Sequence, residues 1–146
     1  MKHRSRNTAE KEAVEYCRKH GLSLTDPRLE VLRIIVSSQK PMGAYEILEK
    51  LGTVIENPKP PTVYRAIEFW RKNGFVHRIE SLNAYIWCRS DHRHSGSQFI
   101  VCDNCHNVEE IHLCEIPEEL KQKAGRTGYA INSWAVELHG LCAACR

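Results

Sequence analysis

The sequence predicts an α+β fold in two parts: an N-terminal winged helix-turn-helix, then a small ββαβ domain stapled by a zinc ion on four cysteines. Three observations predict it. The first half has helical apolar periodicity followed by a strand pair, the element order of a winged helix. The second half contains two Cys-x-x-Cys pairs, at 102–105 and 142–145. The halves also differ in charge: residues 1–85 carry 15 Lys/Arg and 10 Asp/Glu, a balance of +5, whereas residues 86–146 carry 6 and 8, a balance of −2.

The composition is that of a folded protein without a membrane span. With 146 residues, 42% hydrophobic and 27% charged, the chain permits one ordinary domain or two small ones. No apolar run approaches the roughly 18–20 residues that a membrane helix needs. The N-terminus has no signal-peptide apolar region, so we expect a cytoplasmic protein. In that reducing compartment, the seven cysteines indicate metal binding rather than disulfides.

Three early segments, 8–20, 26–38 and 44–51, repeat apolar residues at helical spacing. Thr25 or Asp26 is expected to cap the second helix, because short polar side chains accept hydrogen bonds from first-turn N–H groups. The apolar residues that repeat are Ala13, Val14, Tyr16 and Cys17 in the first segment and Tyr45, Ile47, Leu48 and Leu51 in the third. In the second segment, Leu29, Val31, Leu32, Ile35 and Val36 are expected to form the buried face.

A fourth helix is predicted over residues 62–73, ended by Gly74. The proline-rich stretch 57–61 before it is expected to be non-helical up to its last proline. Four apolar residues of this helix recur at helical spacing and are expected in the core: Val63, Ala66, Ile67 and Trp70.

A strand pair, 75–80 and 84–88, follows the fourth helix and completes the winged-helix order. The polar stretch 89–97 then separates the two halves. We therefore place a winged-helix domain at 1–88, a hinge at 89–97 and a second domain at 98–146.

The second domain has the pattern of a ββαβ unit. Segments 98–102 and 108–112 are predicted strands on either side of the first thiol pair. A helix is predicted at 117–124, and a third strand at 129–138 leads to the second thiol pair.

The outer side of the fourth helix favours DNA binding. A helix that begins at Pro60-Pro61-Thr62 offers backbone N–H groups to a phosphate, and Thr62 lies at that end. Arg65 has the donors for a bidentate bond to guanine, and Tyr64 can stack on a thymine methyl or bond a phosphate. Tyr45, on the preceding helix, is expected to contact the DNA backbone. The alternative is that Arg65 is an ordinary solvated helical arginine.

The two thiol pairs predict a structural zinc site formed by Cys102, Cys105, Cys142 and Cys145. A two-residue spacer lets both thiolates of a tight turn bind one ion, at about 2.3 Å per bond. Four thiolates leave no open position on the zinc, so the site is structural rather than catalytic. The ion supplies roughly 10–16 kcal/mol, comparable to the stability of a whole domain. The alternative, a thioredoxin-like redox pair, lacks the βαβ context.

A second candidate metal set surrounds the predicted hinge. Its members offer nitrogen, sulfur and oxygen ligands: His77, Cys88, Asp91, His92, His94, Glu109 and Glu110. A thiolate in a mixed set favours zinc over manganese, magnesium or hard iron chemistry. The alternatives are that His77 is an ordinary surface or core histidine and that Cys88 only packs.

Five other Cys and His residues have simpler interpretations. Cys17 lies on an apolar helix face and is expected to be a core thiol, and Cys114 a free thiol near a loop. His106 is expected to be exposed. His112 and His139 flank the thiol regions, and whether they bind metal stays open.

The sequence resembles the ferric uptake regulator family, and within it the zinc uptake regulator branch. The resemblance runs from about Leu22 to the C-terminus. The motifs that carry it are Pro60-Pro61-Thr62-Val63-Tyr64-Arg65-Ala66, Gly74-Phe75-Val76-His77, Cys102-Asp103-Asn104-Cys105 and His139-Gly140-Leu141-Cys142-Ala143-Ala144-Cys145.

The resemblance implies a homodimeric repressor without enzymatic activity, whose zinc-loaded form binds the operators of zinc-uptake genes. It implies structural zinc on the four cysteines and regulatory zinc on His77, Cys88, His94 and Glu110, hence two zinc ions per chain. Glu110 is preferred to Glu109 because it lies five residues after Cys105, as in the family pattern. The C-terminal part would be the dimerisation domain.

Three alternative functions stay open. A family regulator responding to iron, manganese or peroxide would share the fold. A thiol oxidoreductase would use Cys102 and Cys105. A structural zinc module would bind another protein.

Overall fold

The computed structural model describes residues 5–90 and 96–146, and the chain forms two compact units, Met1–Asp91 and His92–Arg146. We name them the winged unit and the C-terminal unit and describe each separately. The predicted hinge at 89–97 lies partly outside the described residues. None of the helices within the described ranges is long and apolar enough to cross a membrane.

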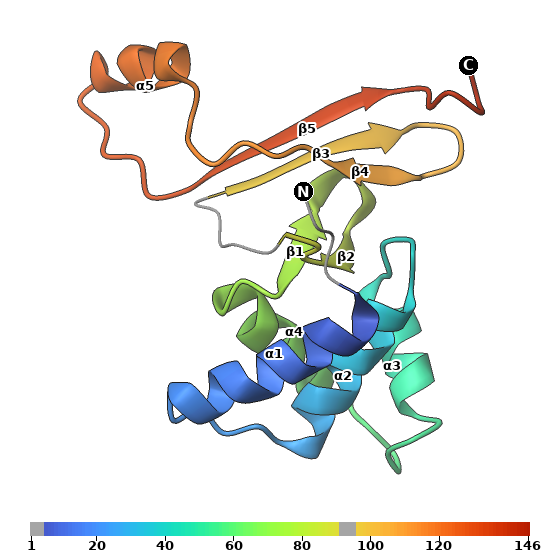
Figure 1. The fold of residues 1–146 in the computed structure, drawn as a ribbon. Helices are drawn as coiled ribbons and strands as arrows, with labels where there is room; N and C mark the ends of the chain where they lie inside the picture. The colour runs from blue at the N-terminus through green and yellow to red at the C-terminus, as the bar shows by residue number, and fades with distance from the viewer. Residues whose placement is uncertain (1–4, 91–95) are drawn as a thin grey trace. The chain divides into compact units, whose positions relative to one another are not determined.

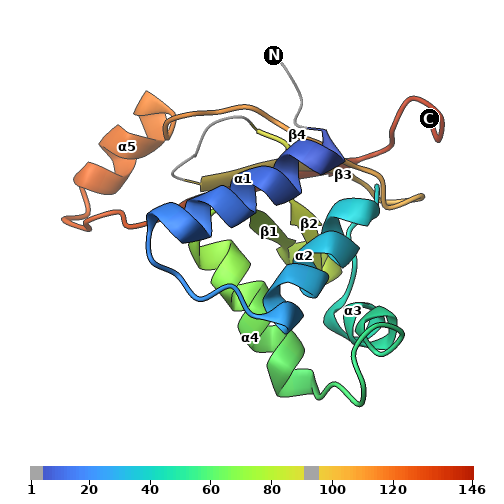
Figure 2. The same cartoon turned by 60° about the horizontal axis from the view of Figure 1, so that its bottom comes forward.

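The winged unit contains four helices and a strand pair, whose arrangement Figures 1 and 2 show. In order these are α1 (Arg6–Lys19), α2 (Asp26–Ser37), α3 (Ala44–Leu51), α4 (Pro60–Lys72), β1 (Val76–Ile79) and β2 (Ala84–Trp87). A short 3-10 turn, η1 (Glu80–Leu82), joins the strands. Helix α2 is central, because it contacts α1, α3, α4 and β2 (Figure 2). This order confirms the predicted winged helix-turn-helix.

Local chemistry explains where the helices begin. The Thr25 hydroxyl accepts a hydrogen bond from the Arg28 N–H at 3.4 Å, so Thr25 is the cap of α2 and Asp26 its first residue. Helix α4 begins at Pro60, two residues before the predicted start. The prediction was wrong because first-turn N–H groups have no partner within a helix, so Pro60 and Pro61 lose no hydrogen bond there.

The core of the winged unit lies between the helices and the hairpin. All four predicted core residues of α4 are buried, and Trp70 is fully enclosed. One other prediction was wrong: Val14, assigned to the apolar stripe of α1, is 41% exposed. The apolar stripe of α1 runs instead through Ala9, Ala13 and Cys17, which confirms Cys17 as a core thiol.

The hairpin pairs β1 and β2 antiparallel, with His77 opposite Ile86. Asn83 completes the turn in the left-handed region, with φ of 46°. An isolated bridge of two backbone hydrogen bonds, at 2.9 and 2.8 Å, joins Met42 to Tyr85 and ties the start of the α3 segment to β2.

The C-terminal unit is the predicted ββαβ (Figure 1). Its elements are β3 (Gly96–Cys102), β4 (Val108–Glu110), α5 (Glu118–Gly125) and β5 (Trp134–Gly140). The sheet order is β4-β3-β5: β3 runs antiparallel to β4 and parallel to β5. Helix α5 lies in the connection that makes the parallel pairing possible.

Strand boundaries in this unit differ from the prediction: β4 ends at Glu110 rather than at residue 112, β5 ends at Gly140 rather than at residue 138, and both β3 and β5 begin elsewhere. Strand β3 begins at Gly96, which the composition had placed in the hinge. A Cβ at Gly96 would collide with the Trp134 carbonyl oxygen, so this glycine is required by strand contact rather than by flexibility. Strand β5 begins at Trp134, five residues after the predicted start at 129, because its partner in the register is Gly96, the first residue of β3.

Candidate metal centres and nucleic-acid interface

The two thiol pairs come together because β3 and β5 are parallel. The register pairs Cys102, the last residue of β3, with Gly140, the last residue of β5. Each strand is then followed by a tight turn, in which the His106 N–H donates to the Cys102 carbonyl and the Cys145 N–H to the Cys142 carbonyl. Both turns therefore lie at the same end of the sheet, where β3 and β5 stop.

The sulfur positions fit a tetrahedral zinc ion. Each Sγ of Cys102, Cys105, Cys142 and Cys145 lies within 4.8 Å of the other three. The Sγ atoms of Cys105 and Cys142 are 3.8 Å apart. Sulfurs about 2.3 Å from a central zinc lie roughly 3.8 Å from one another in a regular tetrahedron. The residues present thus fit the four-cysteine zinc site that the spacing predicts.

Backbone donors favour the thiolate form of Cys102. The N–H groups of Cys105 and Cys142 point at its sulfur and lower its pKa to about 6. The Cys142 nitrogen lies 3.3 Å from that sulfur. These bonds stabilise negative charge, which a zinc ligand carries.

A network of backbone and side-chain contacts holds the turn after β3 against β5. The Asp103 N–H donates to the Gly140 carbonyl at 2.8 Å. His139 Nδ1 lies 3.2 Å from Asp103 Oδ1, and His139 Nε2 lies 3.4 Å from Glu137 Oε2. Among the described residues of this unit, the four thiols alone form a set of three or more clustered metal ligands. His112 and His139 therefore belong to no such set within this unit.

A pair of the predicted regulatory ligands lies in the winged unit. His77 is on β1, and Cys88 directly follows β2. The Cys88 N–H donates to the Phe75 carbonyl at 2.8 Å, which extends the ladder by one pair. Phe75, His77, Ile86 and Cys88 therefore share one face of the hairpin. A ring nitrogen of His77 and the Cys88 sulfur lie within 4.8 Å of each other, close enough to bind one ion.

The other predicted ligands of the regulatory site lie elsewhere in the chain. Glu110 is the last residue of β4, paired in register with Phe99. Glu109 is exposed, whereas Glu110 is half-buried. His92 and His94 lie outside the described residues.

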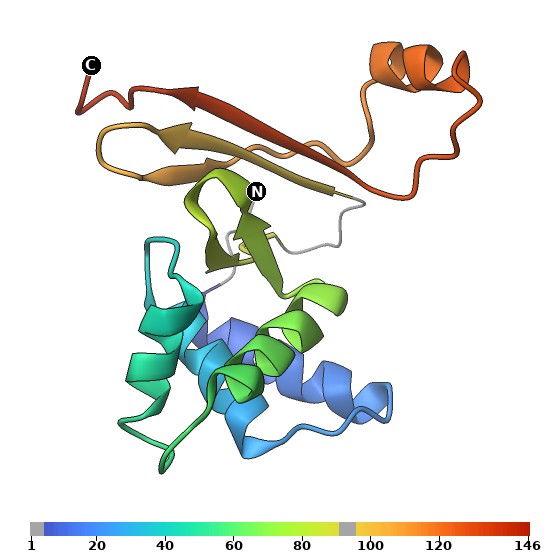
Figure 3. The ribbon, with the colours of Figure 1, turned by 180° about the vertical axis from the view of Figure 1, so that it is seen from behind.

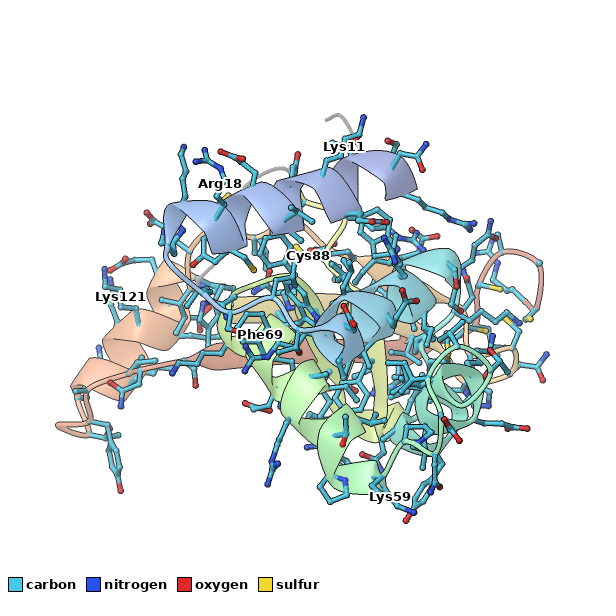
Figure 4. The ribbon with its side chains drawn as sticks, turned by 90° about the horizontal axis from the view of Figure 1, so that it is seen from below. Lys11, Arg18, Lys59, Phe69, Cys88 and Lys121 are labelled. Carbon is cyan, nitrogen blue, oxygen red and sulfur yellow. The ribbon has the colours of Figure 1, made fainter. Side chains whose placement is uncertain are left out.

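The predicted DNA-binding side chains lie on α3 and α4. Tyr45 and Tyr64 are 74% and 47% exposed, unusual values for large aromatic residues. Arg65 is also exposed, and Thr62 is half-buried. Figure 4 shows Lys59 at the start of α4, which adds a positive charge at the positive end of the helix dipole.

The attachment of α4 to α2 was missed by reasoning from the sequence. The Trp70 indole N–H donates to the Arg28 carbonyl at 2.7 Å, and the Arg28 guanidinium lies 4.0 Å from the centre of the Phe69 ring. Figure 4 shows Phe69 on α4. These contacts fix α4 on α2. Arg, Phe and Trp side chains often form such contacts, but the sequence does not show that Arg28 and Trp70, 42 positions apart, meet.

Comparison with known proteins relates this architecture to a family of regulators. The zinc uptake regulation protein of Escherichia coli (strain K12) is 38% identical over 136 residues, covering 92% of this chain and 79% of that protein. The peroxide operon regulator of Bacillus subtilis (strain 168) is 26% identical over 138 residues, covering 92% of each.

Solved structures give the same relationship. A zinc uptake regulator complexed with zinc and DNA has a TM-score of 0.89 and 34% identity, covering 97% of this chain and 95% of the other. Holo XcZur has a TM-score of 0.82 and 37% identity, covering 94% and 96%. The model of the ferric uptake regulator family matches residues 19–139. The chain belongs to the ferric uptake regulator family.

Proposed function

We propose that this chain is a zinc-responsive transcriptional repressor of zinc-uptake genes, which binds operator DNA as a homodimer in its zinc-loaded form. The observation that carries the proposal is that a ring nitrogen of His77 and the Cys88 sulfur lie within 4.8 Å of each other, at the hairpin directly after α4. A thiolate beside an imidazole selects a borderline-soft ion such as zinc. The similarity to zinc uptake regulators over nearly the whole chain supports it.

Two zinc ions per chain would have separate roles. The ion on the four cysteines would be permanent, because its coordination is closed. The regulatory ion would be held by His77, Cys88, His94 and Glu110, residues that come from both units. By binding them together it would favour one arrangement of the units, which is a population shift.

DNA would be read by α4. Arg65 would bond a guanine edge, and Tyr64 and Thr62 would contact a thymine methyl or phosphates. Tyr45 would contact the backbone. In the favoured dimer the two α4 helices would lie about 34 Å apart, one turn of DNA.

The C-terminal unit supports homodimer formation. Strand β5 is an edge of its sheet and has no buried residue, and α5 has none either. Seven of the eleven large exposed hydrophobic side chains among the described residues belong to this unit: Ile100, Leu113, Leu120, Tyr129, Ile131, Leu138 and Leu141. An open strand edge beside apolar surface is the usual setting for pairing with a second copy. Because its target is chromosomal DNA, we place the protein in the cytoplasm.

The test is DNA binding with and without regulatory zinc. Duplexes would be selected from a random pool with the zinc-loaded protein, and their affinity measured after mild chelation and after adding back zinc, manganese or iron. Restoration by zinc alone supports the proposal. Restoration by manganese or iron alone would replace it with a regulator of another metal.

The remaining alternatives have their own tests. A thiol oxidoreductase needs Cys102 and Cys105 to react, whereas zinc-bound thiolates resist alkylation until the ion is removed. The exposed Cys114 serves as the internal reactive control. A structural zinc module that binds another protein would form no specific DNA complex, so chelation would not change DNA binding.

A further inference from the structure

Helix α4 ends in a cap that leads directly into the strand with the first regulatory ligand (Figure 3). Gly74 takes a left-handed conformation with φ of 78°. Its N–H donates to the Arg71 carbonyl at 3.0 Å, and the Phe75 N–H donates to the Trp70 carbonyl at 2.9 Å. This pair of bonds is a Schellman motif. The expected apolar contact is present: the rings of Trp70 and Phe75 meet edge to face, 5.4 Å apart.

The same residue, Phe75, also holds the metal-binding end of the hairpin. Its carbonyl accepts the Cys88 N–H at 2.8 Å. Val76 begins β1, and His77 follows it on the same face as Phe75. Both predicted winged-unit ligands are thus fixed to Phe75, one through a hydrogen bond and the other through two residues of strand.

The Phe75 ring is seated between helices. It is buried, and it contacts Tyr16 of α1 at 5.4 Å in addition to Trp70. Trp70 is itself anchored to α2 by its bond to the Arg28 carbonyl at 2.7 Å. The ring therefore has no room to swing independently of α4, since close-packed interiors transmit displacement rather than absorb it.

We propose that Phe75 is the positioning residue through which zinc at His77 and Cys88 sets the orientation of α4 relative to the β1–β2 hairpin. The inference rests on the proposed function and adds the route of coupling within the winged unit. No loop separates ligand from helix: the path from the Cys88 N–H to the last turn of α4 is one residue, Phe75. Zinc that fixes the hairpin then fixes α4 as well.

The measured quantity is the coupling ratio, the operator dissociation constant with the regulatory zinc removed divided by that with it bound. Simple loss of packing at Phe75 leaves this ratio unchanged in samples that are fully folded both with and without the regulatory zinc, so the fold is checked in both. By linkage, operator DNA must raise the regulatory zinc affinity by the same ratio, which gives an independent readout. The probes are zinc alone, by chelator competition, and the selected duplex.

Two variants and a matched control test the proposal. Phe75→Leu keeps an apolar side chain but loses both ring contacts, and Gly74→Ala strains the cap itself. The control is Gly21→Ala at the end of α1. Gly21 is also left-handed, with φ of 61°, and its cap has the same two bonds, from Gly21 N–H to the Arg18 carbonyl and from Leu22 N–H to the Cys17 carbonyl. That cap leads to neither site.

We expect the wild type and Gly21→Ala to show the same ratio within about twofold, inside the range of roughly 5–150 typical of allosteric coupling. Phe75→Leu and Gly74→Ala should reduce it at least about fivefold. The zinc affinity of Phe75→Leu without DNA should change by less than about twofold, because His77 and Cys88 remain.

Three results would decide otherwise. Ratios in both variants equal to that of Gly21→Ala would make Phe75 an ordinary core residue and overturn the inference while leaving the proposed function intact. Loss of coupling together with loss of zinc affinity in the absence of DNA would make it a support of the ligands alone. A ratio of one in the wild type would overturn the proposed function itself.

Discussion

The Sγ atoms of Cys105 and Cys142 lie 3.8 Å apart although 36 residues separate the two cysteines in the sequence. They are close because β3 and β5 are parallel and in register, so that both strands stop at the same end of the sheet. Few side chains of the C-terminal unit are buried, and none on α5 or β5. The zinc ion therefore has to replace much of the core that this unit lacks.

Cys142→Ser should remove the structural zinc and unfold the C-terminal unit, since the ion contributes roughly 10–16 kcal/mol in comparable sites. Zinc content and amide hydrogen exchange of β3 and β5 measure both effects. Cys114→Ser is the control, because Cys114 is exposed and outside the thiol cluster. Retained exchange protection in Cys142→Ser would show that the sheet stands without the ion.

Arg65→Ala should weaken operator binding by about 1–3 kcal/mol at fixed salt, because a bidentate contact to a base edge is lost. Arg71→Ala is the matched control on the same helix. Arg71 is engaged by Glu68 at 3.2 Å, an exposed ion pair of the kind that contributes little. Fluorescence anisotropy with the selected duplex gives both affinities. Equal losses in the two variants would remove Arg65 from base readout.

Leu138→Lys should convert the dimer to monomers. Leu138 lies on the edge strand β5 with its side chain 50% exposed, and a lysine there opposes pairing with a second copy. Sedimentation velocity reports the change. Val14→Lys places the same charge on α1, at a site that is 41% exposed, and should leave the dimer intact. A dimeric Leu138→Lys protein would move the interface away from β5.

Cys88→Ser should weaken the zinc selectivity of the regulatory site while the structural zinc remains as an internal reference. A hydroxyl is a poor zinc ligand, so the preference for zinc over manganese should fall at least about tenfold. Isothermal titration with each metal measures it. An unchanged preference for zinc would show that Cys88 does not set the metal selectivity, whereas a wild-type site that prefers manganese or iron would indicate a regulator of a hard metal.

Much of the fold could be predicted because the winged unit is locally consistent. The apolar spacing of Val63, Ala66, Ile67 and Trp70 placed all four in the core, and α3 has the predicted bounds Ala44–Leu51. The same reasoning misplaced Val14. Periodicity identifies an apolar side chain but does not tell whether another element covers it, and Val14 is 41% exposed.

The site could be predicted in its ligand types but not in its geometry. Spacing identified the four thiols, whereas the parallel register that joins them depends on pairing over 38 residues, from Gly96 to Trp134. Gly96 shows the limit in another way: composition made it a hinge residue, and only the closeness of the Trp134 carbonyl reveals it as a strand residue. The proposed role of Phe75 rests on its contacts with Trp70 and Cys88, which the spacing of residues in the sequence does not reveal.

Zinc sensing is tested by the zinc content of the reduced protein before and after mild chelation, with operator binding measured on the same samples. We predict two zinc ions per chain, falling to one with the fold kept and operator binding lost, and both restored by added zinc. One zinc ion that never exchanges, in a protein that still binds the operator, would contradict zinc sensing and leave a DNA-binding protein held together by a structural ion.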